Sequence, residues 1–469
     1  MRAIKLHIIG AILLTSFGAQ AAEDSLRFGA FGTVRLYYES PHPENIVLFV
    51  SGDGGWNLGV VDMARALASL DAAVAGVDIV HYLRSLRGSS EKCLYPAGDL
   101  ENLSKVVQQH LNLDTYKVPV LVGYSSGATL VYAVLAQSPS IAFRGAISLG
   151  FCPDLPLDRP MCRGEGLDWQ AGPNGKGYSF LPCSTLEVPW VALQGEIDQV
   201  CNSADTRKFV DQVKNGRIIM LPKVGHGFSV QRNWMPQFKS AFNAMAGRPA
   251  DTARAASAAA GPCGDLPLVE VPGAKPASDA LVIILSGDGG WGKTEKGISR
   301  DLAESGVSVV GWNSLSYYWR KRTPDGAAAD LERIARHYMA SWHKERLVLV
   351  GYSFGADVLP FLVNRLPEDV RSAVRTLALI GPCRYADFEF HLGNWLGRAS
   401  SSPEYRTKPE LEKLRGMNMK IFCFSGENDS DVLCPELDSA LAATIVLRGG
   451  HRVGGNFAPI SRVILENAR

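Results

Sequence analysis

Short runs of aliphatic residues recur along the chain, and longer segments with helical spacing of apolar residues separate them. The runs at 118–122, 280–285 and 347–350 each predict a buried strand. Residues 60–70 have the spacing of an amphipathic helix, and a helix-like run also follows each of the later strands. Alternating strands and helices predict a mostly parallel sheet with helices on both faces. We therefore expect an α/β fold.

Five sequence blocks of the first half return in the same order in the second half. SGDGGW at 51–56 returns at 286–291, and the pattern GYSxG at 123–127 returns at 351–355. This order predicts a tandem duplication of one domain of ordinary size. The other three pairs are 145–154 with 376–385, 191–201 with 422–434, and 217–228 with 444–455.

The segment between the two copies is rich in Ala, Gly and Pro and has no apolar period, which is typical of a linker. We expect an N-terminal domain at 23–246, a linker at 247–265 and a C-terminal domain at 266–469.

The first residues have the form of a secretory signal peptide. A positively charged start precedes an apolar run at 8–17 and a small-x-small site that ends at Ala21. The alternative, an uncleaved membrane anchor, needs about 20 apolar residues, and this run is shorter. We expect a signal peptide at 1–22, cleaved after Ala21 or Ala22, and a periplasmic mature protein.

Composition bounds the possible partners. The chain has 469 residues, of which 46% are hydrophobic and 20% charged, and its net charge is +1. This is a globular composition without the basic excess of a nucleic-acid-binding protein. No CxxC or histidine-rich spacing points to a metal, and we expect no cofactor.

A second motif overlaps the repeated SGDGGW. Residues 287–294 fit G-x-x-x-x-G-K-[ST], the phosphate-binding loop of nucleotide hydrolases. The first copy reads GDGGWNLG at the same place, so the Gly-Lys-Thr ending belongs to one copy only. No later strand ends in the acidic residue that holds magnesium in such enzymes. Nucleotide binding is therefore the weaker interpretation.

Each GYSxG lies between a predicted strand and a helix-like run, which is the context of the nucleophile elbow of α/β hydrolases. In that fold the nucleophile is followed along the chain first by an acid and then by a histidine. In each copy, a later strand and a Gly-Glu turn are followed by an aspartate, and a histidine beside glycines comes after the next strand. The predicted catalytic residues are Ser125, Asp198 and His226 in the first copy, and Ser353, Asp429 and His451 in the second. The fold we expect is therefore a tandem α/β-hydrolase-like duplication.

Two features of this prediction have alternatives. Asp431 is a rival acid in the second copy, although the Gly-Glu-x-Asp alignment favours Asp429. Acyl transfer also requires N–H donors for the oxyanion, one after the nucleophile and one in an earlier loop. SGDGGW occupies that loop, but it can also be a tight turn packed by Trp56 and Trp291. The predicted oxyanion donors are Ser126, Gly52 and Asp53 in the first copy, and Phe354, Gly287 and Asp288 in the second.

The combination of SGDGGW, GYSxG and a late glycine-flanked histidine resembles the VirJ/AcvB family of bacterial virulence proteins. The likeness covers the whole mature chain and corresponds to the long form with two related halves. Residues 317–324, YYWRKRTP, are similar to an aromatic-basic segment of that family. The resemblance implies a periplasmic α/β hydrolase that releases lysine or alanine from aminoacyl-phosphatidylglycerol, linked to type IV secretion and virulence. It carries the nucleophile over to Ser353 and the acid and base to Asp429 and His451.

This substrate implies contacts for an ammonium group and for a lipid. Asp288 and Asp357 are candidates to hold the ammonium, and Trp291 is a further candidate contact. Within residues 317–322, the basic side chains are candidates to face the lipid phosphate and the aromatic ones to lie near the acyl chains. The candidates there are Tyr317, Tyr318, Trp319, Arg320, Lys321 and Arg322, and the alternative is a solvated loop.

Nine cysteines, all in the mature part, permit disulfides outside the cytoplasm. Cys152 and Cys201 occupy the same places as Cys383 and Cys434, so we expect the bridges Cys152–Cys201 and Cys383–Cys434. Cys162 and Cys183 bracket an insertion found only in the first copy, and a third bridge between them is plausible. Cys423 lies within an apolar strand and is expected to be a buried free thiol.

Three functions remain in view. The first is the hydrolysis of aminoacyl-phosphatidylglycerol at the membrane surface, and the second is a general carboxylesterase or thioesterase. The third is a binding or chaperone-like protein for secretion substrates that reuses the hydrolase fold as a scaffold. A scaffold has no physical need for complete triads, which favours an enzyme.

Overall fold

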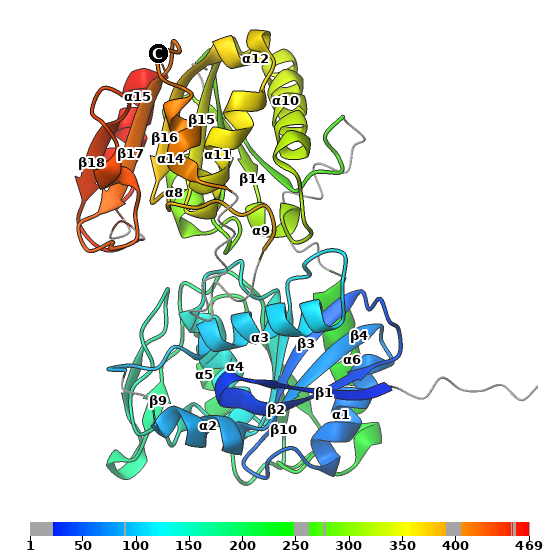
Figure 1. The fold of residues 1–469 in the computed structure, drawn as a ribbon. Coiled ribbons are helices and arrows are strands. Elements are labelled where there is room, and N and C mark those ends of the chain that lie inside the picture. The colour runs from blue at the N-terminus through cyan, green and yellow to red at the C-terminus, as the bar shows by residue number, and fades with distance from the viewer. Residues whose placement is uncertain are drawn as a thin grey trace, which may run out of the picture.

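The structure, a computed structural model, describes residues 22–88, 91–247, 262–274, 278–390, 405–451, 453 and 456–468. Two separate, mostly parallel sheets dominate it, one in each half of the chain (Figure 1). The α/β fold expected from the alternating pattern is thus confirmed. The expected signal peptide and linker lie largely outside the described residues.

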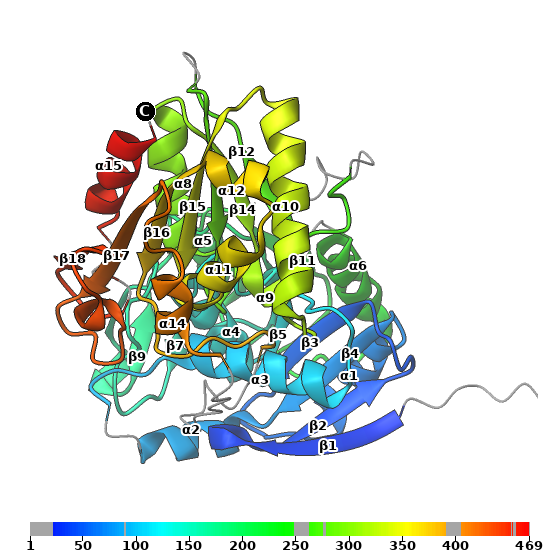
Figure 2. The same cartoon turned by 45° about the horizontal axis from the view of Figure 1, so that its top comes forward.

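The first sheet has eight strands in the order β1-β2-β4-β3-β5-β6-β10-β11. β2 is antiparallel to both of its neighbours. The other strands of this sheet, β4, β3, β5, β6, β10 and β11, run parallel to one another. The β1–β2 hairpin forms one edge of the sheet (Figure 2). The strands are β1 (Ala22–Phe28), β2 (Gly32–Tyr38), β3 (Asn45–Val50), β4 (Ala72–Val77), β5 (Val120–Tyr124), β6 (Gly145–Leu149), β10 (Trp190–Gly195) and β11 (Gly216–Leu221).

Helices cover both faces of this sheet because the central strands are apolar on both sides. In β3, Leu48 and Val50 join one core, whereas Val47 and Phe49 join the other. α2 (Ile79–Arg87), α3 (Pro96–His110), α4 (Ser126–Gln137) and α5 (Ser203–Val210) contribute to the first core. α1 (Leu58–Ala68) and α6 (Met235–Ala246) contribute to the second core.

The second sheet repeats this order without the outermost strand, as β12-β14-β13-β15-β16-β17-β18. Only β12 is antiparallel to its neighbour. The strands are β12 (Leu268–Val271), β13 (Ala280–Leu285), β14 (Ser308–Trp312), β15 (Arg346–Tyr352), β16 (Val374–Ile380), β17 (Lys420–Gly426) and β18 (Ala443–Leu447).

The helices of the second half again lie on two faces. α10 (Pro324–Ser341), α11 (Phe354–Arg365) and α14 (Thr407–Glu412) pack in one core, and α8 (Lys293–Glu304) and α15 (Ala458–Asn467) pack in the other. Two short helices, α9 (Ser314–Tyr317) and α12 (Glu368–Ala373), follow β14 and α11. Among the described residues, no helix has the length and apolar character needed to cross a bilayer.

The insertion of the first half forms a small sheet of its own. β7 (Asp154–Leu155), β9 (Tyr178–Phe180) and β8 (Trp169–Ala171) pair in an antiparallel arrangement. A disulfide joins this insertion to the segment before α3 through Cys93 and Cys162. The expected partner of Cys162, Cys183, is instead a buried free thiol. Our prediction of a Cys162–Cys183 bridge is therefore wrong, because residues distant in sequence lie closer in space.

Two further disulfides tie the loops that follow β10 and β17. Cys152–Cys201 forms as predicted. In the second half, however, Cys434 pairs with Cys423 of β17, and Cys383 keeps a free thiol. The predictions of a Cys383–Cys434 bridge and of a free Cys423 are both wrong. The acid loop of the second half is two residues longer, from Gly426 to Cys434 against Gly195 to Cys201, and it folds back onto its own strand.

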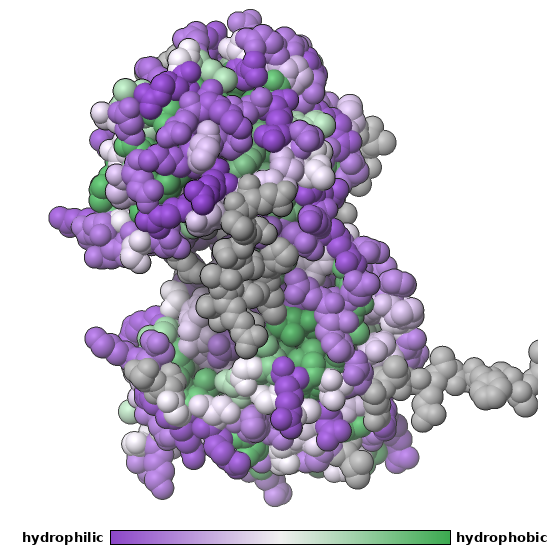
Figure 3. Space-filling view, viewed as in Figure 1, coloured by the Kyte–Doolittle hydropathy of each residue, from purple (hydrophilic) through white to green (hydrophobic). Residues whose placement is uncertain are grey.

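The two halves contact each other through the segment 317–322. Trp319 is buried, donates from Nε1 to the Leu113 carbonyl at 2.9 Å and stacks on Phe390. Arg320 donates to Asn112 Oδ1 at 3.0 Å and to Asp114 Oδ1 at 2.9 Å, both in the first half. On the face drawn in Figure 3, both halves present a mainly hydrophilic surface with smaller hydrophobic areas.

Candidate active sites

Each GYSxG forms a sharp turn between a central strand and the helix that follows it. Ser125 lies between β5 and α4 with φ 55° and ψ −123°, and Ser353 lies between β15 and α11 with φ 50° and ψ −118°. Such positive φ values are strained for serine and are typical of the nucleophile elbow. The flanking glycine allows the start of the helix to approach the end of the neighbouring strand, β3. A Cβ added at Gly127 would lie 2.3 Å from the Val50 carbonyl oxygen.

The structure brings the three predicted side chains together in each half. In the second half, His451 Nε2 lies 2.8 Å from Ser353 Oγ, and His451 Nδ1 lies 2.8 Å from Asp429 Oδ2. In the first half, His226 Nε2 lies 2.9 Å from Ser125 Oγ.

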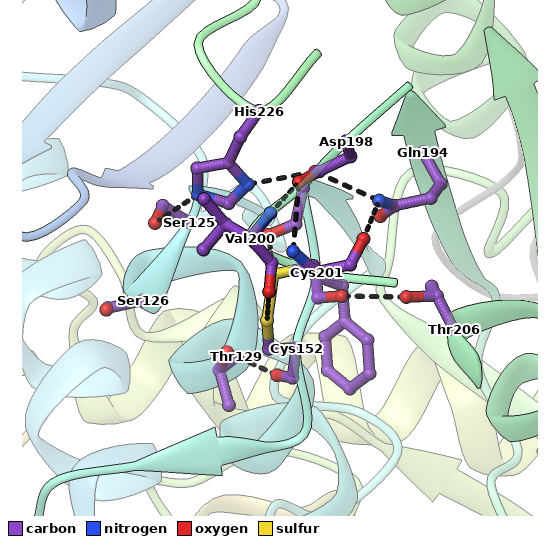
Figure 4. The surroundings of a disulfide bond; sticks show 12 residues. Ser125, Ser126, Thr129, Cys152, Gln194, Asp198, Val200, Cys201, Thr206 and His226 are labelled. Carbon is purple, nitrogen blue, oxygen red and sulfur yellow. Dashed lines mark hydrogen bonds and ion pairs between the residues drawn. A yellow bond between two sulfur atoms is a disulfide. The ribbon is translucent and has the colours of Figure 1, made fainter. Parts of the chain in front are cut away.

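His226 Nδ1 lies 2.9 Å from Asp198 Oδ2 (Figure 4). A serine–histidine–carboxylate chain of this geometry can move a proton from the hydroxyl to the imidazole and stabilise the imidazolium.

Asp198 is held by more than its histidine. Its Oδ1 accepts the backbone N–H groups of Val200 and Cys201, each at 2.9 Å, and its Oδ2 accepts Gln194 Nε2 at 3.0 Å. The Cys152–Cys201 disulfide fixes the same loop (Figure 4). These donors hold the Asp198 carboxylate in place, and its side chain is fully buried.

The rival acid of the second half has another partner. Asp431 lies in the same loop, but its side chain is 82% exposed and pairs with Arg384 Nη1 at 2.8 Å. The Asp429 side chain is 8% exposed and faces His451. The alignment with Asp198 therefore identifies the histidine's partner correctly.

SGDGGW packs against the nucleophile in both halves. A Cβ added at Gly52 would lie 2.9 Å from Ser125 Cβ, and one at Gly287 would lie 3.5 Å from Ser353 Cβ. Gly287 itself is not the oxyanion donor we predicted, because its N–H donates to Glu295 Oε1 at 3.1 Å. Asp288 N–H remains the candidate in this loop.

The other expected donor is the first N–H of the helix after each nucleophile, at Ser126 and Phe354. The first N–H groups of a helix have no intrahelical acceptor and are available to an oxyanion. In the first half, Ser126 Oγ also donates to Asp53 Oδ1 at 2.7 Å, which joins the elbow to SGDGGW. Asp53 and Gly52 therefore both lie beside the nucleophile.

Sequence reasoning missed the role of Glu295. Its carboxylate is buried in α8 and accepts the N–H groups of Gly287 and Gly292, so it fixes the loop that faces Ser353. Burial raises the pKa of Glu295, the two backbone N–H groups oppose the rise, and the charge of Asp288 adds to it. The sequence did contain one signal: Glu295 aligns with Val60 of the first half, so a glutamate stands at a position that is apolar in the other copy.

An acidic cluster lies beside Ser353. Asp357 is one helical turn after the nucleophile, is buried, and accepts the Cys383 N–H at 2.6 Å. Burial raises the pKa of Asp357 well above its usual range, and the charges of Asp288 and Asp431 raise it further. The same carboxylates and burial raise the pKa of the Cys383 thiol. The two residues predicted to hold an ammonium, Asp288 and Asp357, are thus near enough to interact.

Other predicted substrate contacts are buried in the protein. Trp291 is 6% exposed and packs over β14, where a Cβ at Gly311 would lie 2.3 Å from its ring. Tyr318 is 1% exposed, with its ring 5.0 Å from that of Phe354. Both predictions of direct substrate contact are wrong, because these rings complete the core behind the site.

Arg320 and Arg322 of the segment 317–322 have contacts within the protein. Arg320 binds the first half, as described above, and Arg322 donates from Nε to the Tyr317 carbonyl at 3.2 Å and lies over the Tyr317 ring. Tyr317 and Trp319 are buried. Trp319 and Arg320 of the predicted lipid-facing surface therefore contact the first half, and the expectation for Arg320 is wrong. Arg322 is exposed, and its contact with lipid stays a prediction.

One group in the described part of the chain has the spacing of metal ligands. The ligand atoms of Asp198, Cys201 and His226 lie within 4.8 Å of one another. The sulfur of Cys201 is bonded to Cys152, so it is no thiolate ligand. The other two residues are already the acid and base partners of Ser125.

The nucleophile turn on a central parallel strand, with the acid and the base on later strand ends, defines the α/β-hydrolase fold. Both halves of the chain have it. The chain matches the family described as bacterial virulence protein (VirJ) over residues 44–145 and 279–469, and it belongs to that family. The resemblance seen in the motifs is thereby confirmed.

Two solved structures with partial similarity are described as an esterase domain and a serine hydrolase. The esterase domain of a Rhodothermus marinus protein is 15% identical, and the match covers 48% of this chain and 98% of that chain with a TM-score of 0.32. A Xanthomonas campestris protein, described as an α/β serine hydrolase without lid, is 20% identical, with coverage of 49% and 94% and a TM-score of 0.31. A comparison with curated proteins found no match.

Proposed function

We propose that the protein is a periplasmic serine hydrolase whose second half cleaves the aminoacyl ester of aminoacyl-phosphatidylglycerol. The products are free lysine or alanine and phosphatidylglycerol, so the activity bears on membrane lipid homeostasis and, through it, on virulence and type IV secretion. The observation that carries the proposal is the contact of Ser353 with His451 and Asp429 beside an acidic cluster. The three disulfides agree with an oxidising compartment.

The chemistry follows from these contacts. Ser353 Oγ attacks the ester carbonyl while His451 Nε2 takes its proton, and Asp429 stabilises the imidazolium. The carbonyl oxygen becomes an oxyanion, for which Phe354 N–H and Asp288 N–H are the candidate donors. His451 then protonates the leaving lipid alcohol, and water releases the amino acid from the serine.

The acidic cluster supplies the preference for an aminoacyl group. The α-ammonium of the substrate lies next to the carbonyl that reacts, so a carboxylate near the nucleophile can bind it. Burial is the main cause of the raised pKa of Asp357, and repulsion by the charges of Asp288 and Asp431 adds to it. A cation placed among them relieves this repulsion, whereas a neutral acyl group does not.

The test is amino-acid release from vesicles that contain lysyl- or alanyl-phosphatidylglycerol. The mature protein is expected to release the amino acid, and Ser353→Ala is expected to lower the rate by at least about a thousandfold. Asp357→Asn, which keeps an acceptor for Cys383 N–H, should raise KM for the lipid more than it lowers kcat. Absence of release from either lipid by the wild type would refute the proposed substrate.

A further inference from the structure

We propose that the first half contains a second, independent esterase centre that takes neutral acyl esters with an apolar acyl chain. This activity goes beyond the aminoacyl-ester hydrolysis proposed above and does not depend on it. The two centres share their proton-transfer geometry, but the side chains around them differ in charge and polarity.

The first centre is the more enclosed of the two. The side chain of His226 is 17% exposed and that of Asp198 is fully buried, whereas those of His451 and Asp429 are 37% and 8% exposed. The tighter enclosure, together with three further donors on Asp198, preorganises the charge that develops on the histidine. A half that served only as a scaffold would not require these contacts.

The acidic cluster of the second half is largely replaced here. Thr129 stands where Asp357 stands in the second half, one turn after the nucleophile, and it donates to the Cys152 carbonyl at 2.6 Å. Cys152 is in a disulfide where Cys383 is a thiol among carboxylates. The shorter acid loop has Val200 just before its cysteine and no second aspartate after Asp198.

The carboxylate that both halves share is restrained in the first half. Asp53, the counterpart of Asp288, accepts a hydrogen bond from Ser126 Oγ at 2.7 Å. The second half has Phe354, which carries no hydroxyl, at the place of Ser126. A cationic substrate is consequently expected to gain less electrostatic binding energy in the first centre than in the second.

Exposed aliphatic side chains lie on the loops that carry the first acid and base. Ile197 is 62% exposed and Val200 is 67% exposed, on either side of Asp198, and Val230 is 45% exposed shortly after His226. Val200 donates its backbone N–H to Asp198 Oδ1 at 2.9 Å (Figure 4). The counterpart of Ile197 in the second half is Asn428. Apolar side chains on the loops that carry the catalytic acid and base fit an apolar acyl chain.

The reaction is an ordinary two-step ester hydrolysis. The bond from Ser125 Oγ to the acyl carbon forms, the bond from that carbon to the leaving oxygen breaks, and His226 Nε2 moves the serine proton to the leaving alcohol. Water then attacks the acyl-enzyme through the same histidine, which returns a proton to Ser125 and releases the carboxylic acid.

The experiment compares p-nitrophenyl acetate and p-nitrophenyl butyrate as neutral esters with lysine ethyl ester as a cationic one. Ser353→Ala is expected to keep most butyrate hydrolysis and to lose lysine ester hydrolysis, and Ser125→Ala should show the reverse. A fluorophosphonate probe should label two serines in the wild type, and each variant should lose one label. Failure to label Ser125, or loss of all butyrate hydrolysis in Ser353→Ala, would overturn the proposal.

The apolar loops are tested in the Ser353→Ala background. Butyrate has two methylenes more than acetate, and their burial predicts a preference for butyrate of about tenfold. Val200→Asp should reduce this preference, whereas fluorophosphonate should still label Ser125. Val446→Asp is the matched control, since Val446 is 61% exposed on β18 of the second half and should leave the preference unchanged. An unchanged preference in Val200→Asp would refute the apolar acyl subsite.

Discussion

Two aspartates in one loop, Asp429 and Asp431, differ in what they face. Asp429 is nearly buried and contacts His451 Nδ1, whereas Asp431 is exposed and contacts Arg384. An aspartate behind the imidazole fixes the tautomer in which Nε2 accepts the serine proton. The positions thus have different chemistry although the residue type is the same.

Substitution of these two aspartates separates their roles. Asp429→Asn should lower kcat for amino-acid release by about 10³–10⁴-fold, because the amide stabilises the wrong tautomer and no imidazolium. Asp431→Asn should leave kcat within about threefold and act mainly on KM for a cationic substrate. Steady-state kinetics on alanyl-phosphatidylglycerol vesicles measures both. Equal losses of kcat in the two variants would contradict the assignment.

Asp357 predicts a pH dependence of stability. Its pKa is raised in the folded protein by burial and by its acidic neighbours, so the folded state holds this proton more tightly than the unfolded chain. The free energy of unfolding must therefore fall as the pH rises from the usual carboxyl range through the raised pKa.

Asp357→Asn removes this titration and keeps an acceptor for Cys383 N–H. The variant should be more stable than the wild type at pH 8, and the difference should shrink towards pH 4. Urea unfolding at both pH values measures this. A variant that is less stable than the wild type by the same amount at both pH values would contradict the account.

At the scale of the elements, the sequence predicts the catalytic geometry well. The strand at 280–285 matches β13, and the order of serine, aspartate and histidine leads to two groups that meet within hydrogen-bond distance. The reason is that the carboxyl ends of parallel strands meet at one edge of the sheet, so order along the chain determines proximity.

Contacts that depend on packing of distant segments were not predictable in this way. Cys434 pairs with Cys423 and not with the predicted Cys383, because its loop is two residues longer and turns back onto β17. Trp291 and Tyr318 are conspicuous in the sequence, yet their large rings are buried as core. Glu295 was overlooked because a glutamate in a helix is usually exposed, and only the structure shows its two backbone partners.

The disulfides at the acid loops should differ in their contribution to stability. Cys152–Cys201 closes a chain segment with a sequence separation of 49, whereas that of Cys423–Cys434 is 11. The loop-entropy relation gives about 4 kcal/mol for the first and about 3 kcal/mol for the second. Paired Cys→Ser variants of each bridge, compared by urea unfolding, should show the larger loss for Cys152–Cys201. The reverse order would show that loop entropy does not dominate.

For the whole molecule, Trp319 and Arg320 of the segment 317–322 join the halves. Trp319 stacks on Phe390 and reaches the Leu113 carbonyl, and Arg320 binds Asn112 and Asp114. A cavity of about 480 Å³ also opens between the halves, with Ile141 and Lys296 among its lining residues. None of its lining residues belongs to either triad, so the size of a cavity does not locate the chemistry here.

This contact predicts how the halves come apart. Trp319→Ala should cost about 3–5 kcal/mol at a buried site and should make the two halves unfold in separate calorimetric transitions. Arg320→Ala, at a half-exposed ion pair, should cost less than about 1 kcal/mol and leave lipid hydrolysis unchanged. A large loss of lipid hydrolysis in Arg320→Ala, with the stability unchanged, would instead indicate that Arg320 binds the lipid substrate.

If the second half cleaves aminoacyl lipids as proposed, Ser353 becomes acylated by the amino acid of the lipid. The most direct measurement is peptide mass mapping after rapid acid quench of the protein with alanyl-phosphatidylglycerol. The account predicts an alanyl adduct on the peptide that contains Ser353, absent from Ser353→Ala and retained in Ser125→Ala. An adduct confined to another residue, or release of alanine with no adduct in the Ser353 peptide at any quench time, would contradict it.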